Sequence, residues 1–171
     1  MKEQKNNSEL AQAIEGYNTL KKDIHYASYF NMYPAELSVE KLITKGKTKI
    51  KTSEAAFKTP AEFLLWWVNA WKLQQGSCYY CNSKFSDLAK LINSNLLAVR
   101  KIGYGVRGPF PEIERLESTD EKNIYSKENC VLACYYCNND KSYVYSSVDY
   151  KNYFGPAKGL YIKQLLTKLK T

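Results

Sequence analysis

The feature that most constrains this 171-residue chain is a tetrapeptide that occurs twice, Cys-Tyr-Tyr-Cys, at residues 78–81 and 134–137. Two residues between cysteines let a tight turn direct both sulfurs at one ion, and two such turns complete a tetrahedral four-sulfur zinc site. Such a site leaves no open position for a substrate, so this zinc is expected to be structural. The predicted ligands are Cys78, Cys81, Cys134 and Cys137.

Two further features of the cysteines refine the zinc interpretation: the long gap between the two pairs and the presence of a fifth cysteine. The gap between the pairs is too long for a small zinc finger or ribbon, so the metal is expected to join two distant segments of a larger domain. Redox chemistry at one pair is the alternative, but no strand-turn-helix pattern of the thioredoxin type surrounds either pair. Cys130 lies in the apolar run 130–133 and is expected to be a buried thiol.

Charge indicates the kind of partner. The net charge is +8 at pH 7, and 15 tyrosines stand beside 6 phenylalanines. A basic surplus of this size favours a polyanion, nucleic acid first and an anionic membrane surface second. No apolar run reaches about 18 residues, so no membrane span is expected. Residues 1–7 lack the apolar stretch of a signal peptide, and we expect a cytoplasmic protein whose thiols stay reduced.

Helical patterns dominate the N-terminal part. Apolar residues from Leu10 to Tyr17 recur at helical spacing after Ser8, a candidate cap. The strongest local signal is the sequence 59–62, Thr-Pro-Ala-Glu, which combines a capping Thr, a first-turn Pro and a Glu three residues after the cap. The helix after this cap is predicted to end at Gly76. Its tryptophans are expected to be core residues rather than base-stacking platforms; they are Trp66, Trp67 and Trp71.

Between these two helices the pattern is weaker. Residues 22–37 are predicted to be irregular, because Pro34 breaks any helix there. A short helix is predicted from Ser38 to near Gly46. Four lysines then alternate with other residues and would line one face of a strand, where they would follow a phosphate backbone or, alternatively, block aggregation at a solvated edge. They are Lys45, Lys47, Lys49 and Lys51.

The C-terminal half shows shorter elements. A helix is predicted over 86–92, a loop over 103–111, and strands over 111–117 and 130–133 joined by a polar loop. Helix is predicted from Asn138 onward, interrupted near Gly155. The segment 156–170 is predicted to be an amphipathic helix whose apolar residues are Leu160, Leu165, Leu166 and Leu169.

The two strand candidates and the first helical turns after them resemble the HNH nuclease motif. The matching residues are Glu112 to Glu117 and, after the polar loop, 126–141. The resemblance implies an α+β fold: a ββα-metal core of two strands and a helix around one divalent ion, with the four-cysteine zinc site, embedded in mostly helical flanks. The chain is similar to the HNH type II restriction endonucleases whose first strand carries Asp-Arg instead of Asp-His, since Glu114-Arg115 stands at that position.

The resemblance also implies roles for individual residues. Glu114 and Asn138 would hold a catalytic Mg²⁺, which prefers oxygen ligands. Arg115 stays protonated and suits a phosphate clamp better than a base. It would point away from Glu114 on a regular strand, so both serve one site only if the strand twists or ends there. Asn129 would fix the loop between the strands.

The general base and the DNA contacts are less defined. Arg115 replaces the histidine that usually acts as base, which leaves Tyr80, inside the first cysteine pair, or His25, the only histidine. Lys141 either contacts a phosphate or is solvated on its helix. Arg107 and the lysines between 45 and 51 are the other candidates for DNA contact.

We therefore expect three parts: a helical and basic N-terminal arm with a packing helix over 1–75, a zinc-stapled nuclease core over 76–146, and a helical segment over 147–171.

The expected function is Mg²⁺-dependent cleavage of double-stranded DNA, as a restriction enzyme that acts as a homodimer on a palindromic site. A phage or homing endonuclease carries the same motif. A non-catalytic zinc-stapled nucleic-acid-binding module and an RNA-associated protein also agree with the cysteines and the charge.

Overall fold

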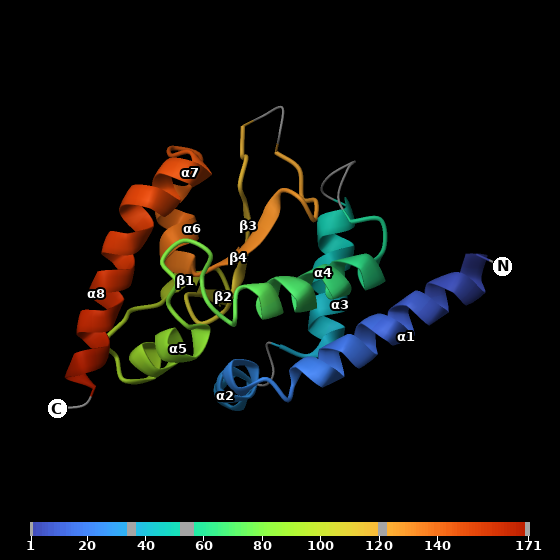
Figure 1. The fold of residues 1–171 in the computed structure, drawn as a ribbon, viewed down its shortest axis with the longest axis horizontal. Coiled ribbons are helices and arrows are strands. Elements are labelled where there is room, and N and C mark those ends of the chain that lie inside the picture. The colour runs from blue at the N-terminus through green and yellow to red at the C-terminus, as the bar shows by residue number, and fades with distance from the viewer. Residues whose placement is uncertain (1, 34–36, 52–56, 120–122, 170–171) are drawn as a thin grey trace.

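A computed structural model describes residues 2–33, 37–51, 57–119 and 123–169. Two layers of helices flank a central β-hairpin (Figure 1). Helices α1 (Lys2–Leu20), α3 (Val39–Lys51) and α4 (Pro60–Leu73) lie on one side, with α2 (Ile24–Met32) below them. The C-terminal helix α8 (Gly155–Lys168) lies on the other side. No helix among the described residues is long and apolar enough to cross a lipid bilayer.

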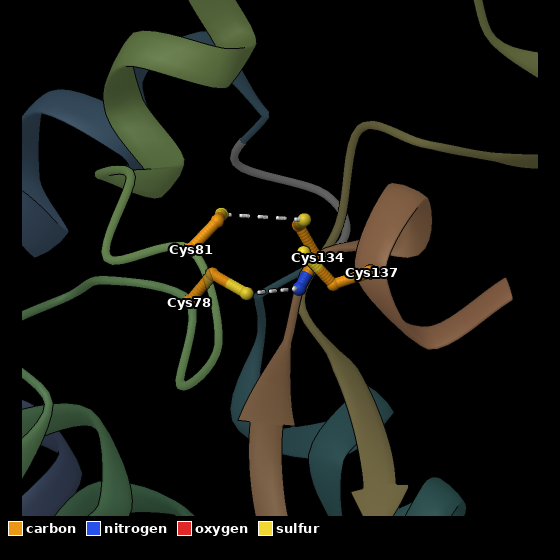
Figure 2. Close-up of side chains that lie close together, drawn as sticks. All are labelled: Cys78, Cys81, Cys134 and Cys137. Carbon is orange, nitrogen blue, oxygen red and sulfur yellow. Dashed lines mark hydrogen bonds between the residues drawn. The ribbon is translucent and has the colours of Figure 1, made fainter. Parts of the chain in front are cut away.

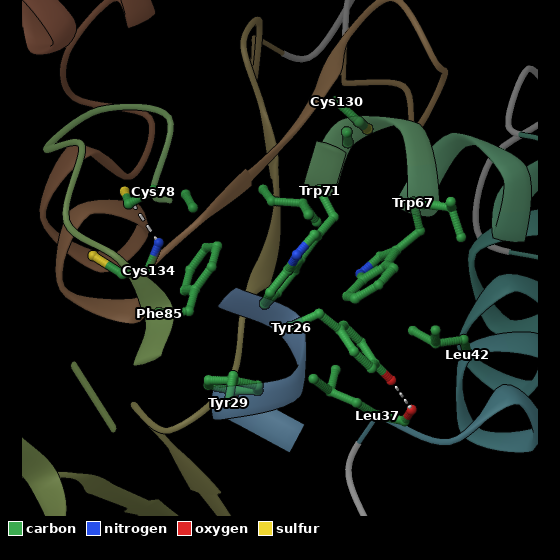
Figure 3. Close-up of a cluster of buried hydrophobic side chains, with 14 of the residues drawn as sticks. Tyr26, Tyr29, Leu37, Leu42, Trp67, Trp71, Cys78, Phe85, Cys130 and Cys134 are labelled. Carbon is green, nitrogen blue, oxygen red and sulfur yellow. Dashed lines mark hydrogen bonds between the residues drawn. The ribbon is translucent and has the colours of Figure 1, made fainter. Parts of the chain in front are cut away.

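Helix α4 forms the centre of the core, as its capping pattern predicts. The Thr59 side chain accepts a hydrogen bond from the Glu62 backbone N–H at 3.1 Å, which confirms the predicted cap. The predicted burial of the three tryptophans is confirmed, with exposed fractions of 9 % for Trp66 and at most 1 % for the other two. Figure 3 shows Trp67 and Trp71 packed among tyrosines and Phe85. These rings hold α1, α2 and α4 together.

Helix α2 corrects the prediction that residues 22–37 are irregular. The Asp23 carboxylate caps the helix by accepting from the backbone N–H groups of His25 and Tyr26, at 2.8 and 3.0 Å. Tyr26 and Tyr29 face the core and are fully buried. Aromatic residues are weak helix formers, so the helix depends on this packing and not on local propensity. Pro34 lies outside the described residues.

Helix α3 corrects the prediction of a lysine-bearing strand. The predicted cap is present, since Ser38 Oγ accepts from the Lys41 backbone N–H at 3.2 Å, but the helix continues past Gly46 to residue 51. A Cβ at Gly46 would lie 2.9 Å from the Phe63 ring, so this glycine lets α3 approach α4 closely. Because a helix turns about 100° per residue, each of these lysines lies about 200° around the helix from the next. The four lysines therefore do not line one face, and the predicted row is wrong.

Two antiparallel hairpins come after the short helix α5 (Phe85–Asn93). The first, β1 (Arg100–Ile102) and β2 (Gly105–Arg107), occupies part of the segment predicted as a loop. The second pairs β3 (Glu112–Arg115) with β4 (Cys130–Ala133), and confirms both predicted strands. Its register sets Glu114 opposite Val131. Successive side chains of a strand alternate between faces, so Glu112 and Glu114 lie on one face of β3.

The chain after β4 is mostly helical, as predicted, but its breaks are elsewhere. Helix α6 (Tyr135–Lys141) ends at Ser142, and α7 (Ser147–Asp149) continues through a π-helical turn, η3 (Tyr150–Phe154), into α8. The predicted interruption near Gly155 is therefore wrong.

Two glycines set the position of α8. A Cβ would lie 2.5 Å from the Tyr80 carbonyl oxygen at Gly155, and 2.5 Å from that of Cys81 at Gly159. Helix α8 thus packs against the backbone of the first cysteine pair. This contact turns Ile162 and Leu165 inward and leaves Leu160 exposed, so the predicted apolar face is only partly correct.

Candidate metal centre and adjoining cavity

The four cysteines of the duplicated tetrapeptide lie together, as predicted (Figure 2). Their sulfur atoms all lie within 4.8 Å of one another, and all four residues are buried. The sulfurs of Cys81 and Cys134 are 3.9 Å apart, and all the cysteines are free thiols. A zinc ion with four Zn–S bonds of about 2.3 Å places its sulfurs about 3.8 Å apart. The cluster can therefore hold a metal such as zinc.

The sequence positions this cluster through a strand and a helix end. Cys134 is the N-terminal cap of α6, and its backbone N–H donates to the Cys78 sulfur at 3.2 Å. The first pair is joined to β4 because the Tyr79 backbone N–H donates to the Leu132 carbonyl at 3.0 Å. The Gln74 side chain adds two bonds to the Leu132 backbone, at 2.7 and 3.0 Å. The metal site thus connects the end of α4 to the second hairpin.

The pKa values of the clustered cysteine thiols are also consistent with a bound cation. Hydrogen bonds from neighbouring thiols, that of Cys134 first, lower the pKa of Cys81, whereas hydrogen bonds with the other sulfurs, that of Cys137 first, and burial raise the pKa of Cys134. A divalent cation removes this competition because each thiolate then has a positive partner. Cys130 lies outside the cluster and is buried, as predicted, and burial raises its thiol pKa to about 12.

A polar cavity of about 710 Å³ adjoins the metal centre where β3, the loop after it and α6 meet. Glu114, Arg115 and Asn138 all contribute to its wall. β3 ends at Arg115, which meets the condition under which both β3 residues can face one site. The Asn138 backbone N–H donates to the Cys134 carbonyl at 3.0 Å, so the second cysteine pair positions this asparagine. The other lining residues are Arg107, Ser118, Thr119, Asn123, Asn139, Ser142 and Tyr143.

Glu114 is held by a buried ion pair. Its carboxylate lies 3.0 Å from the Lys141 ammonium, and the exposed fractions of the two side chains are only 6 % and 1 %. Burial raises the pKa of Glu114, while Lys141 opposes that rise. Both interpretations of Lys141, phosphate contact and a solvated helix position, are wrong. Its buried side chain instead extends from the last residue of α6 to Glu114 and to the Arg115 carbonyl, the latter at 3.4 Å.

We predict that Lys141→Met lowers the free energy of unfolding by about 3 kcal/mol or more, because a buried carboxylate loses its partner. Urea denaturation of the zinc-loaded protein without magnesium measures this change. The matched control is the double variant Glu114→Gln/Lys141→Met, which removes both charges and should recover a large part of the loss. Equal destabilisation in the single and double variants would contradict the importance of the pair.

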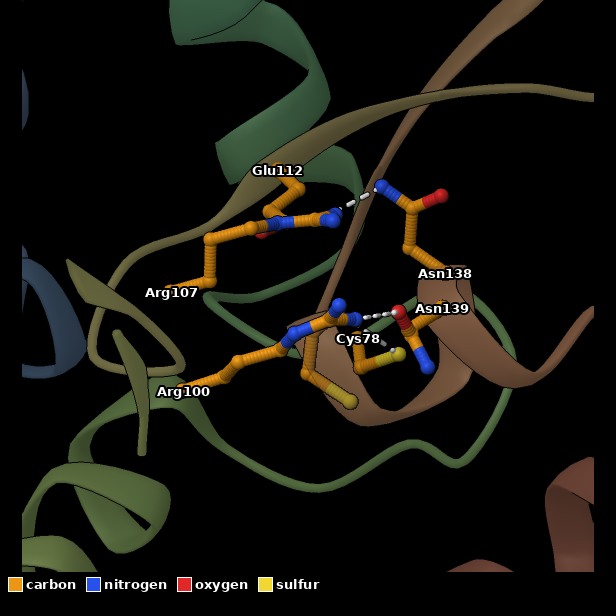
Figure 4. Close-up of polar contacts among 7 residues, drawn as sticks. Cys78, Arg100, Arg107, Glu112, Asn138 and Asn139 are labelled. Atoms are coloured by element: carbon orange, nitrogen blue, oxygen red, sulfur yellow. Dashed lines mark hydrogen bonds and ion pairs between the residues drawn. The ribbon is translucent and has the colours of Figure 1, made fainter. Parts of the chain in front are cut away.

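A second carboxylate, Glu112, was not singled out from the sequence (Figure 4). Arg107 Nε donates to Glu112 Oε1 at 2.7 Å, and a second guanidinium nitrogen contacts Oε2. The Asn138 amide nitrogen donates to the same Oε2 at 2.6 Å. This bidentate pair raises the pKa of Arg107. The spacing of two between Glu112 and Glu114 was the available signal, because it puts both on one face of a strand.

Three residues singled out from the sequence, Arg115, Lys49 and Asn129, lie at or in the loop between β3 and β4. The Arg115 guanidinium lies over the Tyr125 ring, with 4.5 Å to the ring centroid, and the Lys49 ammonium lies 3.9 Å from the same centroid. The end of α3 thus reaches the loop between β3 and β4. Asn129 crosses this loop: its amide donates to the carbonyls of Glu117 and Ile124, both at 2.9 Å. This geometry agrees with the loop-fixing role inferred from the sequence.

Neither candidate base lines the cavity. The Tyr80 hydroxyl is buried and has no hydrogen-bond partner among the described residues. Burial raises its pKa, and the nearby Glu114 carboxylate raises it further. His25 is the second residue of α2, where its Cβ lies against Gly76. Glu112 is not among the lining residues either, but its carboxylate contacts two residues that are, Arg107 and Asn138.

In comparisons with known proteins, the chain matches no protein-family model, no curated protein and no solved structure.

Proposed function

We propose that this protein is a Mg²⁺-dependent endonuclease that hydrolyses phosphodiester bonds in double-stranded DNA, with restriction of foreign DNA as its role. One observation carries the proposal: a single polar cavity beside the four-cysteine site collects Glu114, Arg115 and Asn138. These are the residues to which the HNH resemblance assigns metal binding and phosphate contact. Their elements, a two-stranded hairpin followed by a helix, are in the order that this resemblance implies.

The donor atoms suit a hard cation. Magnesium prefers oxygen ligands and keeps several waters, so one carboxylate and one amide oxygen suffice. Glu114 and Asn138 would supply them. When bound, Mg²⁺ would neutralise charge on the scissile phosphate and on the leaving oxygen. The amide nitrogen of Asn138 is engaged by Glu112 at 2.6 Å, which leaves the amide oxygen on the other side of the group.

The remaining residues would bind phosphate and move a proton. Arg115 and Arg107 line the cavity and remain protonated, so they suit binding of the phosphate and stabilisation of charge in the transition state. Glu112 would accept the proton of the attacking water at Oε2. It has the required proximity to Asn138, and it becomes available when the phosphate draws Arg107 away.

A non-catalytic zinc-stapled nucleic-acid-binding module is the second candidate. The observation that favours it is that both carboxylates are already neutralised, Glu114 by Lys141 and Glu112 by Arg107. Such pairs also occur in a purely structural network. This candidate keeps the basic surface and the four cysteines but needs no magnesium.

Incubation of zinc-loaded protein with supercoiled plasmid and Mg²⁺ tests the proposal, with duplex and single-stranded RNA as further substrates. Nicked or linear plasmid supports a DNA endonuclease. Binding without cleavage across divalent metals and varied DNA sequences would favour the binding module, and cleavage of RNA alone would favour an RNA-associated role.

In the same assay Glu112→Gln should be inactive, whereas Tyr80→Phe should cleave like the original protein. The reverse result would make Tyr80 the base.

A further inference from the structure

The hairpin β1–β2 is basic and exposed, and Arg107 is its only residue that the proposed chemistry uses. Between Asp87 and Glu112 the sequence has no acidic residue, whereas it contains Lys90, Arg100, Lys101 and Arg107. All residues of the two strands are exposed except Arg107, which is half-buried. Tyr104 at the turn is wholly exposed. A short ribbon of this kind is marginally stable by itself, so its base must be held by the rest of the protein.

The base of the hairpin is anchored to the helix that carries Asn138. The Tyr136 hydroxyl of α6 donates to the Ala98 carbonyl at 2.8 Å, just before β1. Just after β2, the Tyr29 hydroxyl donates to the Pro109 carbonyl. Gly108 turns the chain between these contacts with φ +130°, a value that favours glycine. The ribbon is thus fixed at its base beside the cavity, while its turn extends into solvent.

The two arginines of the ribbon form an unfavourable pair. Arg100 lies directly opposite Arg107 in the register, so both side chains emerge on the same face. Like charges in that position destabilise a hairpin. Arg107 is compensated by Glu112, but the contact described for Arg100 is to a neutral amide, Asn139 Oδ1 at 3.4 Å (Figure 4). An anion between the two guanidinium groups would relieve this repulsion.

We propose that the β1–β2 hairpin is the surface that binds the DNA duplex, inserted into its major groove. Arg100 and Arg107 would contact backbone phosphates, and Tyr104 would contact the groove. The major groove is about 12 Å wide and admits a two-stranded ribbon. This proposal rests on the proposed function, because Arg107 also lines the cavity and would deliver the bound backbone to it.

The test compares duplex affinity of variants of the full, zinc-loaded chain. Fluorescence anisotropy with a labelled duplex of about 30 base pairs, in buffer without magnesium, measures binding without cleavage. Arg100→Ala should weaken binding about tenfold and reduce the slope of log affinity against log salt by about 1. Tyr104→Ala should weaken binding with an unchanged salt slope. Lys163→Ala, which removes one exposed charge from α8, is the matched control and should change affinity less than about twofold.

Trypsin provides a readout that needs no variant. Cleavage after Arg100 and Lys101 should be fast in the free protein, because both residues are exposed, and should be suppressed by the duplex. Equal protection by single-stranded DNA, RNA or polyglutamate would overturn the assignment to duplex. Equal loss of affinity in Arg100→Ala and Lys163→Ala would do so too.

These experiments distinguish a failure of the hairpin proposal from a failure of the nuclease proposal. Hairpin-dependent binding by a protein that never cuts plasmid would support the ribbon and refute the nuclease. Cleavage and binding that are both unaffected by Arg100→Ala and Tyr104→Ala would support the nuclease and refute the ribbon.

Discussion

Replacement of Cys134 by serine is expected to remove the bound zinc and to lower the free energy of unfolding by about 4 kcal/mol or more, as loss of a structural metal does. The melting temperature of a chain of this size should fall by about 10 °C or more. Cys134 is buried, caps α6 and lies 3.9 Å from the Cys81 sulfur. Without the metal, three buried thiols must regain protons in a space that suits a tetrahedral ion.

The damage should be local, and this distinguishes a metal that joins segments from one on which the whole fold depends. The tryptophan core of α1, α2 and α4 buries enough apolar surface to persist, so tryptophan fluorescence should change little. Amide hydrogen exchange should accelerate in β4, α6 and the residues 78–81.

The chain offers a matched control for this experiment. Cys130 is another buried cysteine, four residues before Cys134, but it lies outside the sulfur cluster. Cys130→Ala should therefore keep one zinc per chain, as measured by atomic emission, and most of the thermal stability. A Cys134→Ser protein that retains a full zinc complement and its melting temperature would refute the four-sulfur site.

Elements with strong local signals were predictable from the sequence. The cap and periodicity of α4, the helix α5, the strands β3 and β4 and the sulfur cluster all agree with the structure. Each depends on neighbours in sequence or on a repeated ligand pattern. By contrast α2, α3 and the β1–β2 hairpin depend on tertiary contacts. Gly46, for example, suggests a helix end until Phe63 is seen to pack against it.

The candidate site likewise has a part that could be predicted from the sequence and a part that could not. Motif positions predicted that Glu114, Arg115 and Asn138 would share one cavity, and they do. The partners of the charged groups were not predictable, because they come from different elements. Lys141 pairs with Glu114 across 27 positions of sequence, and Arg107 reaches Glu112 from the end of another hairpin. Spacing indicates which groups gather, but it does not indicate which charges pair.

The second large effect is expected at Asn138. We expect Asn138→Ala to reduce the rate of plasmid cleavage by more than about 100-fold, since even outer-shell partners of a metal are worth roughly 10–100-fold. The fold and the zinc content should persist. Alanine is a better helix former than asparagine, and Glu112 keeps its bidentate contact with Arg107 when the 2.6 Å amide bond is lost.

Two further variants make this result specific. Asn69→Ala is the matched control, because it makes the same change at an exposed position of α4, outside the cavity, and should leave cleavage unchanged. Asn138→His supplies a different side chain that can bind a divalent ion, and should recover much of the activity that alanine loses. If Asn138→Ala cleaves at the original rate with its zinc in place, the amide does not bind the catalytic cation, and the magnesium site must be sought elsewhere. If histidine is as inactive as alanine, Asn138 acts through its hydrogen bond to Glu112 and not as a ligand, since an imidazole can bind a divalent ion but cannot reproduce a primary amide.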